Sequence, residues 1–201
     1  MSRIDQSTAA IRLAENLGVI RVRDAMAHGV HPEVLRRLTQ RGVMVKVGRG
    51  TYALASADAS AHRDLALAAL RVPTGVVCLL SALSFHEIGT QLPHEVWMMI
   101  DRRARTPNVD HPPIRFVRGS GTVLTTGLQL VEIDGSRVRL FDPAKTVVDC
   151  FRYRRHVGLD VALEALREAL RARRCTPGQV WECADRCGVG TVMRPYLEAM
   201  A

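Results

Sequence analysis

The chain has 201 residues, of which 47% are hydrophobic and 24% charged, and its formal net charge at pH 7 is +8. This composition is typical of a globular protein with one or two domains and argues against long disordered segments. The sequence contains no apolar run near the ~18 residues needed to span a membrane and no signal peptide, so we expect a cytoplasmic protein.

The positive charge is concentrated at the N-terminal end of the chain. Residues 1–56 carry nine Lys or Arg and four Asp or Glu, a net charge of +5 out of the total of +8. A basic region of this kind favours a polyanionic partner, such as nucleic acid or a membrane surface.

Helices are predicted over most of the first 41 residues. Apolar residues at helical spacing in 8–17, preceded by Ser7, predict the first helix, and residues 23–28 predict a short second one. The third runs to Arg41 from Pro32, which suits the first helical position because its missing N–H needs no partner there. One side of this third helix is apolar, with Val34, Leu35 and Leu38, and the other side carries Glu33, Arg36, Arg37, Gln40 and Arg41.

A hairpin is predicted directly after the third helix. Residues 43–54 alternate between apolar and polar on both sides of Gly48-Arg49-Gly50. We expect Lys46 and Arg49 to face solvent at this hairpin. The residues expected to pack are Val43, Val45, Val47, Tyr52 and Leu54.

This order of elements is that of a winged helix-turn-helix, in which the third helix enters the major groove and the hairpin, or wing, lies along the DNA backbone. Arginine can hold a guanine edge or a phosphate through two parallel hydrogen bonds, and glutamine can read adenine. The expected partner is therefore double-stranded DNA and not a membrane. The candidate DNA contacts are His31, Arg36, Arg37, Gln40, Arg41, Lys46 and Arg49.

Alternatives stay open for this segment. A small helical domain with a solvated arginine face would show the same pattern, and His31 also suits a helix N-cap. Arg36 and Arg37 are neighbours that cannot both point into the groove, so we expect one to contact a base and the other a phosphate. Arg41 and Lys46 are equally compatible with plain solvation.

The remainder of the chain is predicted to be α+β, with a small antiparallel sheet and a helical C-terminal end. Residues 56–60 are small and polar, as in a linker. Arg102, Arg103 and Arg105 form a basic loop between two predicted strands. The predicted strands are 96–101, 114–118 and a hairpin of 128–134 with 137–141 around an Asp-Gly turn; the predicted helices are 61–71, 76–88, 143–154, 160–174, 177–187 and 192–200.

No cofactor or metal is expected. The five cysteines are an odd number without an export signal, which predicts reduced thiols, and Cys183 and Cys187 with Cys175 upstream lack the CxxC pairs of common zinc sites. His86-Glu87 does not continue as HExxH because residue 90 is Thr, so His86 is interpreted as a packed or hydrogen-bonded residue. A metal-dependent nuclease is a weaker hypothesis, because no spacing rule brings together its candidate residues Asp101, Asp142, Lys145, Asp149 and Glu164.

The chain as a whole resembles the AbiEi antitoxins of bacterial abortive-infection and toxin–antitoxin operons. The most specific segment of the resemblance is residues 141–170, FDPAKTVVDCFRYRRHVGLDVALEALREAL. The other segments are VGRGTYAL (47–54), VVCLLSALSFHEIGTQLPHEVWMMI (76–100), IRFVRGSG (114–121) and RPYLEAM (194–200).

The resemblance implies a non-enzymatic protein with two domains, a winged helix-turn-helix at 1–55 and an antitoxin domain at 60–201. The first domain would repress its own operon by binding inverted repeats in the promoter, as winged helices often do as dimers. The second would neutralise a nucleotidyltransferase-type, AbiEii-like toxin, which in the type IV view of these systems need not be contacted directly. The alternative is a stand-alone regulator whose C-terminal domain senses a signal or assembles.

The resemblance also singles out a motif whose members would serve either the antitoxin function or only its fold. Asp149 and Arg152 lie on adjacent turns of one predicted helix, so a simple intrahelical ion pair is one interpretation. The motif comprises Lys145, Asp149, Arg152, Tyr153 and Arg154.

Overall fold

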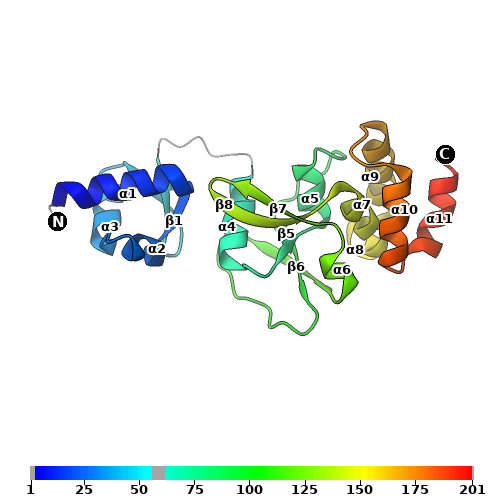
Figure 1. Cartoon of the computed structure of the whole chain (residues 1–201), viewed down its shortest axis with the longest axis horizontal. Helices are drawn as coiled ribbons and strands as arrows, with labels where there is room; N and C mark the ends of the chain where they lie inside the picture. The colour runs from blue at the N-terminus through cyan, green and yellow to red at the C-terminus, as the bar shows by residue number, and fades with distance from the viewer. Residues whose placement is uncertain (1–2, 56–61, 201) are drawn as a thin grey trace.

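The computed structural model describes residues 3–55 and 62–200 of the chain, and the side chains from residue 6 onward within these ranges. Figure 1 shows an elongated molecule with the N-terminal region at one end, a sheet in the middle and the C-terminal helices at the other end. The predicted linker at 56–60 lies outside the described residues. In the part of the chain that is described, no helix is long and apolar enough to cross a membrane.

The N-terminal region has the element order of a winged helix-turn-helix. Helix α1 begins before the predicted position, so Ser7 lies inside it and is not its cap. The strands form a three-stranded antiparallel sheet in the order β1-β3-β2. The elements are α1 (Arg3–Leu17), β1 (Val19–Arg21), α2 (Val22–Ala27), α3 (Pro32–Gln40), β2 (Met44–Gly48) and β3 (Thr51–Leu54).

The apolar face of α3 packs into the core of this region as predicted, and Leu35 is completely buried. Of the hairpin residues expected to pack, Val45 is the exception: it is 39% exposed, whereas Met44, which was not among them, is 1% exposed and joins the core. Val43, Val47 and Tyr52 are partly buried and pack on the hydrophobic clusters. Met44 pairs with Leu54 on the face toward the helices, so Val45 and its partner Ala53 occupy the opposite face. That face is covered only in part, which leaves Val45 in solvent.

The C-terminal region is built on a mixed sheet of five strands in the order β6-β5-β4-β8-β7. The predicted antiparallel hairpin is β7 with β8, but the pairs β5–β6 and β4–β8 are parallel. Its first elements are α4 (Arg63–Arg71), β4 (Val76–Val77), α5 (Leu79–Phe85), β5 (Val96–Asp101), β6 (Ile114–Gly119), α6 (Thr122–Thr125), β7 (Leu128–Ile133) and β8 (Ser136–Phe141).

The helix predicted at 76–88 was wrong at its start. Val76 and Val77 form the central strand β4, because both are fully buried, and Val77 pairs with Met98 on one side and Leu140 on the other. β-Branched residues fit such a doubly flanked strand. Only residues 79–85 are helical, and they follow the strand after a single residue.

The C-terminal helices surround α7. Asp142 caps α7 by accepting a hydrogen bond from the Lys145 amide at 2.7 Å, and Thr176 caps α10 in a capping box with Gln179. The predicted helix 143–154 is interrupted near residue 153 and continues as α8. These helices are α7 (Pro143–Arg152), α8 (Arg154–Val157), α9 (Leu159–Arg171), α10 (Pro177–Arg186) and α11 (Gly190–Glu198).

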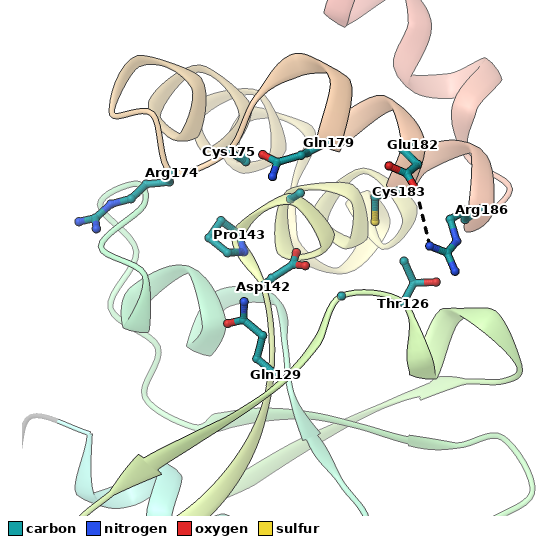
Figure 2. Close-up of a pocket in the computed structure, with 12 residues that line it drawn as sticks. Thr126, Gln129, Asp142, Pro143, Arg174, Cys175, Gln179, Glu182, Cys183 and Arg186 are labelled. Carbon is teal, nitrogen blue, oxygen red and sulfur yellow. Dashed lines mark ion pairs between the residues drawn. The ribbon is translucent and has the colours of Figure 1, made fainter.

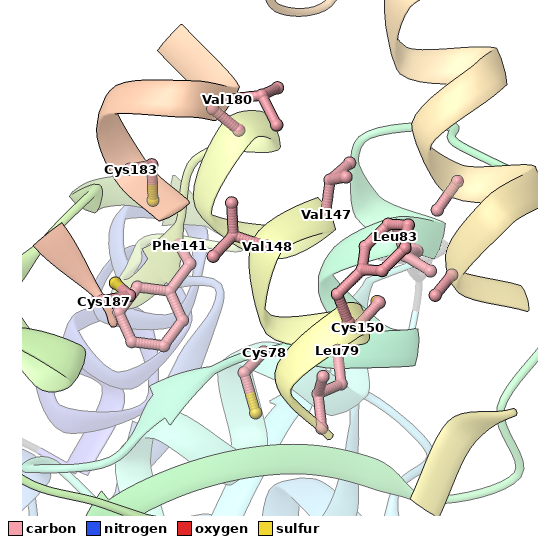
Figure 3. Close-up of a cluster of buried hydrophobic side chains, with 14 of the residues drawn as sticks. Cys78, Leu79, Leu83, Phe141, Val147, Val148, Cys150, Val180, Cys183 and Cys187 are labelled. Carbon is pink, nitrogen blue, oxygen red and sulfur yellow. The ribbon is translucent and has the colours of Figure 1, made fainter. Parts of the chain in front are cut away.

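The sheet separates two hydrophobic clusters. The larger cluster joins one sheet face to α5, α7, α9 and α10, and Figure 3 shows Phe141, Val148 and Val180 within it. The smaller cluster lies between α4 and the opposite face. Since α4 covers only one face, its outer side is available to the N-terminal region.

The two regions meet where α4 packs on the three-stranded sheet. Leu67 of α4 clusters with Val19 and Ala53 on the sheet face that points away from the winged-helix core. Two turns also meet closely: a Cβ on Gly18, whose φ is +64°, would lie 2.1 Å from the Asp134 carbonyl oxygen. The C-terminal region therefore supports the three-stranded sheet on the face opposite the winged-helix core.

Candidate nucleic-acid interface

The third helix begins at a histidine cap. The backbone amide of Glu33 donates a hydrogen bond of 3.3 Å to Nδ1 of His31, whose backbone is extended, and Pro32 follows at the first helical position. The side chain of His31 is exposed. The predicted alternative of an N-cap is thus confirmed for the free protein.

The outward face of α3 carries Glu33, Arg36 and Gln40, all exposed. Arg36 donates hydrogen bonds to Glu33, with Nη2 at 2.8 Å from Oε1 and Nε at 3.0 Å from Oε2. The hydrogen bond from Arg36 lowers the pKa of Glu33 below its usual value. The guanidinium is therefore held along the exposed face, where guanidinium, amide and carboxylate together can read base edges.

Arg37 and Arg41 form a separate row beside α1. They line a shallow groove with Ser7, Ile11 and Val43. Arg37 is half-buried, and its Nε is shielded from solvent with no hydrogen-bond partner among the described residues. The two neighbouring arginines thus point in different directions, as their adjacency required.

The wing is short and its tip is fixed. Lys46 and Arg49 are both exposed, and a bulge interrupts pairing between Lys46 and Gly48. The Arg49 carbonyl accepts a hydrogen bond of 2.7 Å from Arg71 Nη2 of α4. A Cβ on Gly48 would lie 2.7 Å from that same nitrogen, so glycine makes room for the arginine. The Arg49 side chain stays available to a ligand.

Two basic residues near the wing tip were missed by the sequence reasoning. Val22 donates its amide to the Gly50 carbonyl at 2.9 Å, which places the start of α2 beside the wing. Arg23 in that first turn is 70% exposed. Arg71 is the other residue. No sequence signal links either one to the wing, because both contacts depend on tertiary packing.

The C-terminal motif centres on a buried ion pair. Lys145 and Asp149 are both 0% exposed and are paired through Nζ and Oδ2, and Nζ also lies 4.0 Å from the centroid of the Phe141 ring. Oδ1 of Asp149 has no hydrogen-bond partner among the described residues. Burial raises the pKa of Asp149 to about 6, although the Lys145 cation opposes this shift. The expected partner Arg152 is replaced by Lys145.

The other motif residues hold neighbouring backbone segments. Arg152 donates to the Cys187 carbonyl at 2.7 Å, and the Tyr153 hydroxyl donates to the Arg118 carbonyl at 2.7 Å. Arg154 donates to the Phe151 carbonyl at 2.9 Å. Arg152 is exposed, and Tyr153 and Arg154 are half-buried. These three side chains thus connect backbone segments through hydrogen bonds, and part of each side chain remains exposed to solvent.

A polar cleft of about 280 Å³ lies between the start of α7 and α10. Figure 2 shows Asp142 and Pro143 on one side and Gln179, Glu182 and Cys183 on the other. The Asp142 carboxylate already accepts the Lys145 amide, and Glu182 pairs with Arg186 at 3.7 Å. Its charged groups are therefore largely satisfied.

The remaining chemical candidates are structural. All five cysteines are free and buried, and His86 Nε2 lies within hydrogen-bond distance, 2.7 Å, of the Phe141 carbonyl, as a packed histidine would. The Cys183 thiol, as a hydrogen-bond donor, lowers the pKa of Cys187, and burial opposes this shift. Within residues 3–55 and 62–200, no group of three or more His, Cys, Asp or Glu side chains could hold a metal ion.

Comparison with known proteins relates the N-terminal region to a family and the whole chain to a fold. Residues 9–55 match the family model described as "Transcriptional regulator, AbiEi antitoxin". The chain is similar to the crystal structure of the RV2827C protein from Mycobacterium tuberculosis, with a TM-score of 0.60, 12% identity, and coverage of 96% of this chain and 81% of that one. Comparison with curated protein sequences gave no significant match.

Proposed function

We propose that this chain represses its own toxin–antitoxin operon, because residues 9–55 match the family model described as "Transcriptional regulator, AbiEi antitoxin". Residues 1–55 form the DNA-binding domain and residues 60–201 the antitoxin domain. The observation that carries the proposal is the exposed face of α3, where Arg36 and Gln40 project beside a wing that presents Arg49. The DNA site is a set of inverted repeats in the promoter, bound by a dimer.

The residues divide into base readers and phosphate contacts. Arg36 and Gln40 lie on the outward face of α3 and are assigned to base edges in the major groove. Arg37, Arg41, Lys46 and Arg49 flank that face and are assigned to phosphates. His31 is assigned to capping and positioning α3 and not to recognition of a base.

A binding titration on the chain's own upstream DNA tests repression. If each monomer contacts about four phosphates, the logarithm of the binding constant falls with the logarithm of salt concentration at a slope near −4 per monomer, or near −7 for the bound dimer, at ~0.9 per phosphate. Random DNA of equal length is the control. Equal affinity for both duplexes at every salt concentration would contradict sequence-specific repression.

The antitoxin activity is assigned to the C-terminal domain and acts on a nucleotidyltransferase-type toxin encoded nearby, with no need of direct contact. Burial of Lys145 and Asp149 supports a structural role for this pair. The accessible part of the motif consists of Arg152, Tyr153 and Arg154, which are partly or fully exposed. No catalytic role is assigned to this chain.

Co-expression with the neighbouring toxin tests the division of labour. A full-length Arg36→Ala/Arg37→Ala variant should restore growth like the wild type while losing operator binding. Loss of both activities together would favour the alternative of a stand-alone regulator with a sensing C-terminal domain. Absence of a nucleotidyltransferase gene beside this one would favour that alternative too.

A further inference from the structure

A cleft of about 490 Å³ lies between the two regions of the molecule. One wall is formed by β1 and α2 of the N-terminal region, and the other by the end of α4 with the β7–β8 hairpin. In Figure 1 the tip of this hairpin, in yellow-green, lies next to the N-terminal region. Small-molecule sites have volumes of about 300 to 1,000 Å³ and occur preferentially at such junctions between domains.

The contact that borders the cleft is close at the hairpin tip and small elsewhere. Gly135 has a φ of +68°, and a Cβ at this position would collide with the backbone of Leu17. Beside this tip, the apolar cluster between the regions has Val19, Ala53 and Leu67 as its buried members in the described part of the chain. The junction therefore has a fixed geometry and leaves apolar surface unfilled beside it.

The apolar lining of the cleft comes from both regions. Val19 and Leu70 belong to the apolar cluster between the regions, so the lining continues that cluster. Leu17 and Leu70 are half-buried, and Ala27 at the end of α2 is exposed. An apolar group in the cleft would remove surface of both regions from water, which favours binding. The apolar lining residues are Leu17, Val19, Ala27, Ala69, Leu70 and Pro73.

The charged lining of the cleft is basic on both walls. Arg21 and Arg23 come from the N-terminal region, and Arg137 comes from β8. Asp24 supplies a carboxylate, which is already paired with Arg21 at 2.7 Å and with Arg23 at 3.4 Å. Arg137 is exposed and forms no ion pair with a described residue, although Glu132 lies opposite it in the β7–β8 register. With histidine neutral, the lining carries a net charge of +2, which favours an anion.

We propose that this cleft binds a small amphipathic anion, in which one carboxylate head is joined to an aliphatic body. The head lies among the guanidinium groups, and its principal anchor is Arg137, the arginine of the cleft without an anionic partner among the described residues. The aliphatic body packs on the apolar lining. A ligand in this position touches both regions and stabilises their contact. Its binding does not depend on the proposed repression.

Isothermal titration calorimetry of the full chain with octanoate tests the chemistry of the site. We expect one site per chain with a dissociation constant of about 1 mM or lower, and saturating octanoate should raise the melting temperature because it binds the folded state. Two further probes separate the parts of the ligand, because 1-octanol lacks the charge and inorganic phosphate lacks the aliphatic body. Each should bind at least ~10-fold more weakly than octanoate. Absence of octanoate binding, or equally tight binding of either probe, would overturn the proposal.

Two variants locate the bound octanoate. Arg137→Ala removes the unpaired cation, and Ala27→Trp fills the cleft from the exposed end of α2. Each should weaken octanoate binding by ~10-fold or more. Arg155→Ala removes an exposed arginine of α8 outside the cleft and is the matched control, which should bind like the wild type. Unchanged binding in both cleft variants would put the octanoate elsewhere and contradict the assignment.

The fold of each variant is checked without ligand by circular dichroism and urea unfolding. Arg137→Ala and Arg155→Ala should match the wild type, because both positions are exposed. Should Ala27→Trp be unstable, Arg137→Glu replaces it: this variant reverses the charge at an exposed position and should lose octanoate binding while it stays folded. A folded Arg137→Glu protein with wild-type affinity for octanoate would rule out the anchor. Wild-type protein that binds its operator but not octanoate would contradict the ligand site alone.

Discussion

Helices α3 and α7 look alike in sequence and differ completely in environment. Both begin with a cap residue followed by proline, and both carry a cation and a carboxylate within one turn of each other. In α3 the pair is Arg36 and Glu33, 63% and 49% exposed, whereas in α7 it is Lys145 and Asp149, both 0% exposed. The first pair leaves a guanidinium free to exchange partners, and the second is part of the core.

The consequence is a difference in what each pair does for the protein. An exposed ion pair contributes little to stability because solvent screens it. A buried pair leaves an uncompensated charge when one partner is removed, so each partner is needed by the other. Substitutions in α3 should therefore change binding, and substitutions in α7 should change folding.

The largest effect is expected for Lys145→Met. Removal of the cation leaves Asp149 buried without a partner, which should lower the free energy of unfolding by about 3 to 5 kcal/mol. Urea unfolding followed by circular dichroism measures it. Arg155→Met, on an exposed position, is the control and should cost under ~0.5 kcal/mol.

The double variant Lys145→Met/Asp149→Leu sharpens this prediction. Replacing a buried ion pair with apolar residues is often neutral, so most of the lost stability should return. A double variant as unstable as Lys145→Met alone would show that the cost comes from packing of the new methionine. It would not come from the unpaired carboxylate.

The pH dependence of stability should carry the signature of Asp149. Burial raises its pKa from the ordinary 3.8 to about 6, so between these values the folded state binds more protons than the unfolded state. Stability from this group is full below pH ~4 and is lost as pH rises through ~6, by up to about 3 kcal/mol. Urea titrations from pH 4 to 8 give the free energies of unfolding of the wild type and of Asp149→Asn. The wild-type value minus the variant value should decrease as the pH rises. A difference that grows instead would mean that attraction to Lys145 outweighs burial.

The two arginines of α3 should separate in DNA binding. Arg36→Ala should weaken operator binding on the order of 10- to 100-fold and relax discrimination against random DNA, because a base contact is lost. Arg37→Ala should weaken both duplexes equally and reduce the salt slope by about 1. Fluorescence anisotropy on both duplexes measures each variant. Reversed behaviour would exchange the two assignments.

Local signals in the sequence were sufficient for most elements of this molecule. Pro32, the Asp142-Pro143 pair and the Asp134-Gly135 turn each have one favourable backbone solution, and the structure has the predicted element at all three. The prediction of a helix from residue 76 was wrong because Val76 and Val77 belong to a continuous apolar run. Periodicity alone cannot distinguish a central strand from a buried helix in such a run.

The exposure of the candidate DNA-binding residues could be predicted from the sequence, but the environments of the buried motif could not. The exposed positions Arg36, Gln40 and Arg49 follow from helical and hairpin periodicity. Burial of Lys145 depends on α5, α9 and α10 converging on α7, and the contact of Arg71 with the wing joins residues 22 positions apart. Both are tertiary features, which no spacing within one element encodes.

The smallest effect is expected at His31, whose cap can be separated from DNA recognition. His31→Ala removes the acceptor for the Glu33 amide and should lower the free energy of unfolding by about 0.5 to 1 kcal/mol. His31→Ser restores an acceptor and should restore the stability. If the imidazole acts only as a cap, operator affinity of the Ser variant, measured by anisotropy, stays within a factor of two of the wild type. A larger loss with full stability would make His31 a DNA contact in its own right.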